Sequence, residues 1–271
     1  MEPFDLDRIG GPAGLRALTD ELLACGELAL RLYSGGVAAR TQRKPDRSPV
    51  TEADQLVEER LLGFLAEQYP EARTWGEETG SDDAMTTGLR FLVDPIDGTR
   101  AFVAGLPSWC VLIGLVKDGK PILGVIDQPW LDERYVGVGD EAWLECRGER
   151  TPLKTRDCPR LTEAVLSTTD PFILTAPERG AFEHIRATAR LTRYGLDAYA
   201  YARLAAGTID MVTETGLKPH DVAALFPVIE GAGGVITDWR GNPAQLGGQI
   251  VAAANRKILD EALVSLRRSA L

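Results

Sequence analysis

Several features that mark secreted, membrane-spanning or zinc-binding proteins are missing from this sequence. Its 271 residues include two histidines and four cysteines, and the cysteines lack the short paired spacings of zinc or thioredoxin motifs. No apolar run approaches the length of a membrane span, and Met1–Gly14 lacks the apolar segment of a signal peptide. We therefore expect a cytoplasmic protein with scattered reduced thiols, namely Cys25, Cys110, Cys146 and Cys158.

Positive charge is also scarce. The sequence has 30 Lys and Arg residues against 40 Asp and Glu residues, which gives a formal net charge of −10. A field of this sign repels nucleic acids and anionic lipids, so we expect neither as a partner. The same field repels phosphorylated small molecules at long range, and a local cluster of metal ions would have to overcome it.

The most informative segment is Asp-Pro-Ile-Asp-Gly-Thr at positions 94–99, which directly follows the apolar run Leu89–Val93. The run predicts a buried strand, and Pro95 prevents it from continuing as a regular ladder. Carboxylates suit a hard divalent cation, and a Gly-Thr turn suits a phosphate oxygen. The segment therefore predicts metal-assisted phosphate chemistry, although a plain strand-ending turn uses the same residue types.

Two further acidic sites change the balance between these interpretations. Glu77 lies in the glycine-flanked segment Trp75–Gly80, which alone would indicate a solvated turn. Asp221 lies just before an apolar helix, where an acid in the first turn is ordinary helix chemistry.

Together, in this order and spacing, the three segments resemble the inositol monophosphatase superfamily, and the resemblance extends from about Leu15 to about Leu266. The second signature of that superfamily is similar to the stretch from Asp221 to Val235. Within the superfamily the chain looks most like the histidinol-phosphatase branch. The segments that carry this likeness are Ala101–Pro107, Gly124–Pro129, Arg193–Tyr199 and Glu214–Pro219.

The order of the expected elements predicts an α+β fold. An apolar stripe over Leu15–Leu32 indicates a first helix, and Thr51–Asp54 resembles the capping box of a second. An antiparallel meander follows, with a hairpin turn at Asp118-Gly119, and strands then alternate with helices. We expect an N-terminal α+β half over 1–157 and a C-terminal α/β half over 158–271. The resemblance adds the layered α/β/α/β/α sandwich.

The resemblance implies a cluster of up to three Mg²⁺ ions. Glu77, Asp94 and the Ile96 carbonyl match the family's ligands for the first ion. Asp94, Asp97 and Asp221 match those for the second, and Glu77 also borders the third. Without cations such carboxylates would repel one another, so we expect metal binding to stabilise the fold.

The resemblance also assigns residues to the reaction and to the substrate. Glu77 and Thr99 would orient the attacking water, and the N–H groups of Gly98 and Thr99 would hold phosphate oxygens. Asp197 and Glu214 would provide carboxylates for the ammonium and imidazole of histidinol phosphate. A helix N-cap is the alternative for Asp197, and an ordinary strand-end acid is the alternative for Glu214.

Two further residues lie where the resemblance suggests a role near the site. Lys44 falls where family members carry a mobile loop, and a solvated loop charge is its alternative. Asp54 falls near the third metal, and a capping-box residue is its alternative. Neither histidine is required.

The leading hypothesis is a Mg²⁺-dependent histidinol-phosphate phosphatase that produces histidinol in histidine synthesis. An inositol-1-phosphate or broad sugar-phosphate monophosphatase is the closest alternative, because fold alone does not decide the substrate. A bisphosphate nucleotidase is disfavoured by the lack of a clear basic pocket. A regulatory protein that contacts transcription machinery is the alternative of another class, and the intact ligand set speaks against it. The family favours homodimers.

Overall fold

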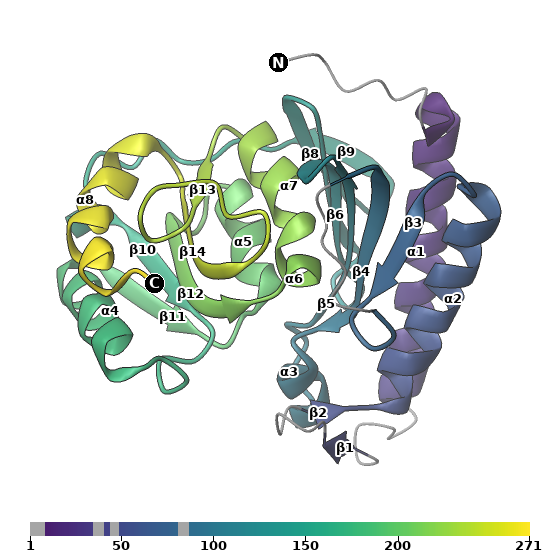
Figure 1. Cartoon of the computed structure of the whole chain (residues 1–271), viewed down its shortest axis with the longest axis horizontal. Helices are drawn as coiled ribbons and strands as arrows, with labels where there is room; N and C mark the ends of the chain where they lie inside the picture. Colours follow the sequence, from purple (N-terminus) through teal and green to yellow (C-terminus); the bar gives the residue numbers. More distant parts are fainter. Residues whose placement is uncertain (1–8, 35–40, 44–48, 81–86) are drawn as a thin grey trace.

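The computed structural model of the protein describes residues 9–34, 41–43, 49–80 and 87–271. Its elements form five layers, in the order helices, sheet, helices, sheet, helices (Figure 1). The predicted α+β sandwich is thus confirmed. Within the described residues, no helix combines the length and apolarity that a bilayer crossing requires.

Two long helices form the first layer. Helices α1 (Gly11–Ser34) and α2 (Glu52–Gln68) cover one face of the larger sheet, and the apolar stripe predicted for α1 is buried there. The capping box predicted for α2 is also present, because the Thr51 N–H donates to Asp54 Oδ2 at 2.7 Å. A small two-stranded sheet of β1 (Gln42–Arg43) and β2 (Pro49–Val50) precedes α2 and was not predicted.

The second layer is a seven-stranded sheet in which strands follow one another in chain order. All neighbours are antiparallel except β3 and β4. The hairpin turn predicted at Asp118-Gly119 is confirmed, with both residues at positive φ. The two edge strands of this sheet, the first and the last in the list below, were not predicted. The strands are β3 (Arg73–Gly76), β4 (Leu89–Asp97), β5 (Cys110–Lys117), β6 (Lys120–Gln128), β7 (Glu133–Val138), β8 (Glu141–Cys146) and β9 (Glu149–Pro152).

A β-bulge at Pro95 and Ile96 interrupts the ladder between β4 and β5. Asp94 pairs with Leu112 and Asp97 pairs with Cys110, so two residues of β4 stand opposite one residue of β5. Positions three apart on a regular strand point to opposite faces. Because the bulge adds one residue, Asp94 and Asp97 face the same side of the sheet. Strand β4 continues past Pro95 to Asp97, but its regular hydrogen-bond ladder is interrupted there, as predicted.

The fourth layer is a mixed five-stranded sheet of order β11-β10-β12-β14-β13. Its first three strands are parallel and its last two pairings are antiparallel. Helices α4 (Ala176–Thr188) and α8 (Arg256–Leu266) cover its outer face (Figure 1). The strands are β10 (Val165–Thr168), β11 (Leu191–Tyr194), β12 (Met211–Leu217), β13 (Val235–Thr237) and β14 (Gly248–Ala253).

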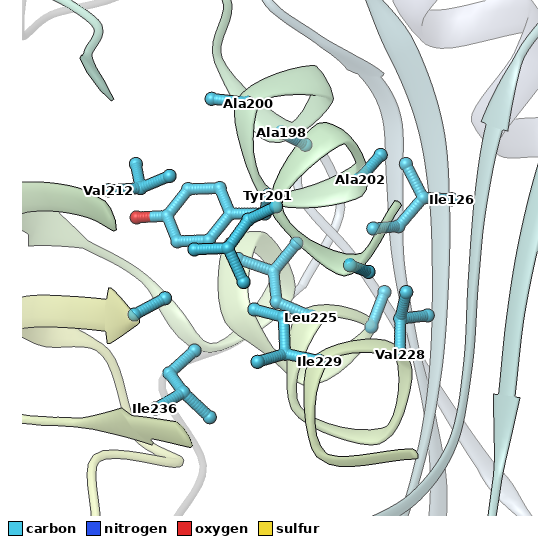
Figure 2. Close-up of a cluster of buried hydrophobic side chains, with 14 of the residues drawn as sticks. Ile126, Ala198, Ala200, Tyr201, Ala202, Val212, Leu225, Val228, Ile229 and Ile236 are labelled. Atoms are coloured by element: carbon cyan, nitrogen blue, oxygen red, sulfur yellow. The ribbon is translucent and has the colours of Figure 1, made fainter. Parts of the chain in front are cut away.

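The middle layer consists of helices α5 (Ala198–Ala205), α6 (Pro219–Ala223) and α7 (Leu225–Gly231). Figure 2 shows Tyr201, Leu225 and Ile229 of this layer between Ile126 of the larger sheet and Ile236 of the smaller one. One buried core therefore joins the two halves. The division at residue 157 stays a prediction.

A row of glycines lets the middle helices lie directly on the larger sheet. Gly114, Gly124 and Gly137 stand side by side on β5, β6 and β7. A Cβ at Gly124 would lie 2.1 Å from the carbonyl oxygen of Ala224, and one at Gly137 would lie 2.2 Å from the Pro227 backbone. Only glycine permits this approach, which sets the depth of α6 and of its acid, Asp221.

Candidate metal centre and substrate pocket

The sequence-predicted acids Asp94, Asp97 and Asp221 meet at the junction of the two halves. Each offers a carboxylate oxygen that lies within 4.8 Å of the other two. The bulge in β4 turns Asp94 and Asp97 to one side, and the glycine row brings α6 with Asp221 against that side. The cluster thus depends on residues from distant parts of the chain.

The protein itself offers each of these three acids one main-chain donor. The N–H of Ile96 donates to Asp94 at 3.1 Å, that of Ala198 to Asp97 at 2.6 Å, and that of Lys218 to Asp221 at 2.6 Å. Among the described residues, no Lys or Arg forms an ion pair with any of the three. These bonds engage one carboxylate oxygen of each acid, and the other oxygen of Asp221 lies 3.3 Å from His220 Nε2.

Electrostatics disfavour the ionised cluster when no cation is present. Burial raises the pKa of Asp94 well above its usual range, and the nearby carboxylates of Glu77, Asp97 and Asp221 raise it further. Burial likewise raises the pKa of Asp97 and of Asp221. Buried like charges at this separation ionise together only when a counter-charge is supplied.

Thr99 lies beside this cluster, and its hydroxyl has two acceptors within hydrogen-bond distance. Its Oγ1 lies 3.0 Å from the carbonyl oxygen of Ile96 and 3.3 Å from Asp54 Oδ1. Asp54 is fully buried, and its other oxygen closes the capping box of α2. The capping role considered for Asp54 is therefore confirmed, and the same side chain also reaches the site.

A cleft of about 240 Å³ opens next to the acids. It lies between the segment that begins at Asp97 and the ends of β10 and β12. Arg100 is the only Lys or Arg among the described residues that line it, and it pairs with Asp170 at 3.3 Å. Other lining residues include Glu77, Gly98, Thr99, Thr169, Asp197 and Glu214.

Glu214 is buried at the wall of this cleft and is held by protein donors. Its Oε1 accepts bonds from the N–H and the hydroxyl of Thr169, at 2.9 and 2.5 Å, and its Oε2 accepts from Tyr201 at 3.2 Å. Burial nevertheless raises the pKa of Glu214 to about 7. The carboxylate is oriented by its neighbours and is only partly ionised near neutral pH.

Asp197 faces the cleft and does not cap the helix that it precedes. It occupies the N-cap position of α5 with a left-handed φ of 48°, but its side chain makes no capping bond. Asp97 instead accepts the Ala198 N–H, so the N-cap alternative for the Asp197 side chain is wrong. A Cβ on Gly98 would lie 3.1 Å from Asp197 Oδ2, which places Asp197 against the Gly-Thr turn. Burial raises the pKa of Asp197 to about 6.

Some residues of the site escaped sequence reasoning, and one predicted residue has no described position. Lys44 lies outside the described residues. Arg100 directly follows the metal motif and could have been found by that adjacency. Thr169 and Tyr201 gave no sequence signal, because their partner Glu214 is distant in the chain.

Comparison with known proteins identifies the family. A model described as the inositol monophosphatase family matches residues 15–271. The chain belongs to the inositol monophosphatase family. A solved inositol monophosphatase from Zymomonas mobilis has 37% sequence identity and a TM-score of 0.76, with 92% of this chain and 96% of that chain covered.

Curated relatives of this family member carry more specific names. The chain is 42% identical to the chloroplastic bifunctional phosphatase IMPL2 of Arabidopsis thaliana, over 82% of this chain. The match spans 66% of the plant protein, just under two thirds of its length. A histidinol-phosphatase of Mycobacterium tuberculosis is 35% identical, with 87% of this chain and 91% of that protein covered.

Membership supports a hydrolase that acts on small phosphate monoesters. The family is generally metal-dependent, and the described acids fit a divalent cation on their own chemistry. Hard cations prefer oxygen ligands, and this cluster provides carboxylates from three positions with one backbone donor each.

Proposed function

We propose that the protein is a Mg²⁺-dependent phosphatase of L-histidinol phosphate and releases L-histidinol and phosphate. The observation that carries this proposal is the acidic cleft beside the Asp94, Asp97 and Asp221 cluster. Histidinol phosphate combines a phosphate with an ammonium group and an imidazole. A metal cluster suits the phosphate, and the carboxylates of Asp197 and Glu214 suit the cationic end.

In this proposal five groups hold up to three Mg²⁺ ions, namely Glu77, Asp94, the Ile96 carbonyl, Asp97 and Asp221. The Ile96 carbonyl already accepts the Thr99 hydroxyl, but a carbonyl oxygen has a second lone pair. When bound, Mg²⁺ supplies the Lewis acidity that activates water and neutralises phosphate charge. Because Mg²⁺ retains several waters, an incomplete shell of protein ligands is sufficient.

The residues around Thr99 position the reacting groups. Asp54 and Ile96 fix the Thr99 hydroxyl, so that, together with Glu77, it can orient an attacking water in the cleft. The N–H groups of Gly98 and Thr99 hold phosphate oxygens. Catalysis of phosphoryl transfer rests mainly on such positioning and on electrostatic stabilisation.

Asp197 and Glu214 bind the amino-alcohol end of the substrate. Thr169 and Tyr201 hold Glu214 in one orientation, and an ionised carboxylate has further lone pairs for a substrate N–H. A cationic substrate favours the ionised form of Glu214, whose pKa burial raises to about 7. The neutral hydroxyls of inositol-1-phosphate also donate to carboxylates, which makes that ester the second candidate.

The proposal extends to the assembly and location of the protein. Leu106, Trp130 and Leu131 are exposed by 52%, 48% and 42%. The Gln128 side chain bonds to both Pro107 and Leu131, so these apolar side chains come from adjoining loops. We infer a homodimer that covers them, in a cytoplasm that keeps the four free cysteines reduced. Sedimentation at micromolar concentration distinguishes dimer from monomer.

The decisive test measures phosphate release with Mg²⁺ from L-histidinol phosphate and from inositol-1-phosphate, each with an EDTA control. We expect a large preference in kcat/KM for histidinol phosphate that is lost with EDTA. Equal or reversed values would retain the phosphatase and overturn the substrate. Activity that persists in EDTA would overturn the metal assignment.

The variant Glu214→Gln tests the substrate pocket, with Glu183→Gln on the exposed surface of α4 as the matched control. Loss of the carboxylate should lower kcat/KM for histidinol phosphate by about 10- to 100-fold, as for a charged hydrogen bond. The Mg²⁺ concentration that gives half-maximal activity should stay unchanged. An unaltered kcat/KM would remove Glu214 from the substrate site.

A further inference from the structure

The loop that carries Glu77 has every backbone N–H from Glu77 to Gly80 engaged. The Glu77 N–H donates to the Val93 carbonyl at 3.1 Å, and the Gly80 N–H donates to the Gly76 carbonyl at 2.9 Å. The two N–H groups between them donate to a single side chain, Glu58 of helix α2. The distances are 2.8 Å from Glu78 to Oε2 and 2.9 Å from Thr79 to Oε1.

Glu58 is therefore a buried carboxylate inside a turn of main-chain donors. The Thr79 hydroxyl adds a third donor to Oε1 at 2.7 Å, and the Glu58 side chain is only 1% exposed. An ionised carboxylate with three donors is a strong, directional anchor. Both carboxylate oxygens of Glu58 thus have donors in the loop itself.

The fit between Glu58 and the loop requires glycine at position 76. A Cβ on Gly76 would lie 2.1 Å from Glu58 Cδ and 2.3 Å from Oε1. The backbone thus approaches the carboxylate more closely than any other residue type allows. Glu58 also lies one helical turn after Asp54, so α2 directs two buried acids toward the site region, one at Thr99 and one at the Glu77 loop.

We propose that Glu58 is a positioning residue that fixes the Glu77 loop in the conformation that binds Mg²⁺. This inference rests on the proposed metal site. Groups that do not touch the metal but hold its ligands in place affect metal affinity strongly, commonly by 10- to 100-fold. Glu58 itself contacts neither substrate nor metal.

The first test is hydrogen exchange of metal-free Glu58→Gln, with Glu59→Gln on the exposed face of α2 as the matched control. The glutamine amide presents an N–H₂ group where the loop needs an acceptor. We expect the amides of Glu78 and Thr79 to exchange at least about tenfold faster in Glu58→Gln, with the control unchanged. Unchanged protection would overturn the anchoring role.

The second test is calorimetric titration of the metal-free proteins with Mg²⁺. We expect Kd to rise about tenfold in Glu58→Gln, and kcat to recover at saturating Mg²⁺. A lower Tm with wild-type Mg²⁺ affinity would show a merely structural role and overturn this inference alone. Failure of the wild-type protein to bind Mg²⁺ would instead overturn the proposed function.

A milder variant covers the case in which Glu58→Gln does not fold. Thr79→Val removes the hydroxyl donor to Glu58 and keeps the backbone donors. We expect a two- to threefold loss of Mg²⁺ affinity in Thr79→Val, and none in Thr79→Ser, which retains the hydroxyl. Equal affinity of both variants and the wild-type protein would overturn the proposal.

Discussion

The buried acids outside the candidate metal centre and those within it are satisfied in opposite ways. In the C-terminal half, Glu178 is 2% exposed and accepts bonds from Thr175, Thr215 and Gln249. Burial by itself raises its pKa, but these donors outweigh burial and lower the pKa to about 2. Asp210 is fully buried and accepts two bonds from Arg156, at 2.8 and 2.6 Å.

At the candidate metal centre the neighbours of the buried acids are mainly other acids, apart from His220, whose Nε2 lies 3.3 Å from Asp221. Asp94 receives one N–H, from Ile96, and its pKa is raised by burial and by Glu77, Asp97 and Asp221. The contrast separates two kinds of buried carboxylate. An acid supplied with protein donors needs no cation, whereas acids gathered against one another indicate a cation from outside.

The largest effect should come from Asp94→Asn. Losing this carboxylate should lower kcat about a thousandfold, because the metal contribution to phosphate chemistry amounts to several kcal/mol. Metal-free stability should stay equal or rise, because one member of a repelling cluster becomes neutral. Phosphate release and urea unfolding in EDTA measure both quantities. The control is Asp20→Asn on the exposed surface of α1, and near-wild-type turnover would sink the metal assignment.

Arg156→Ala in the C-terminal half should have the opposite effects: lower stability and unchanged turnover. Among the described residues, it leaves the buried Asp210 carboxylate with a single donor, the Val165 N–H at 2.7 Å. Asp210 is fully buried but the Arg156 side chain is 39% exposed, so its loss should cost about 2 kcal/mol of unfolding free energy. Turnover per folded molecule should not change, since Arg156 lies outside the cleft. Arg160→Ala, which removes an exposed pair, is the control in urea unfolding; equal stability of the two variants would contradict this role.

The smallest effect is a difference between Glu178→Gln and Glu214→Gln in how the unfolding free energy depends on pH. The pKa of Glu178 is lowered in the fold to about 2, so its stabilisation is present above pH 4.5 and is lost as pH falls toward 2. The pKa of Glu214 is raised to about 7, so its stabilisation is present below pH 4.5 and is lost as pH rises through 7. Each contribution is on the order of 2 kcal/mol.

Urea unfolding in EDTA between pH 3 and pH 8 separates these two variants. Glu178→Gln should remove part of the loss of stability toward acid, and Glu214→Gln should remove part of the loss toward neutral pH. If the unfolding free energy of both variants changed with pH as in the wild-type protein, neither acid would have a shifted pKa in the fold, contrary to the account.

Much of the fold follows from the sequence because its elements are locally encoded. The apolar stripe of α1, the Thr51 capping box of α2 and the Asp118-Gly119 hairpin each occupy one short segment. The three acidic segments were found together because their order and spacing resemble those of the inositol monophosphatase superfamily.

The missing parts depend on contacts between distant segments. Whether Asp94 and Asp97 face the same side depends on the bulge, and the ladder to β5 defines that bulge. Gly114, Gly124 and Gly137 become one row only after three strands pair. Glu58 looks like any helical acid until the loop 20 residues later folds over it. Sequence reasoning therefore identified the acids of the cluster, but not the bulge and the glycine row that bring them together.

The most direct test of the account is a diffraction measurement on crystals grown with Mn²⁺ in place of Mg²⁺. The account predicts anomalous density among the carboxylates of Asp94, Asp97 and Asp221, and none at Glu178 or Asp210. Well-ordered crystals at saturating Mn²⁺ with no anomalous density in that cluster would contradict it.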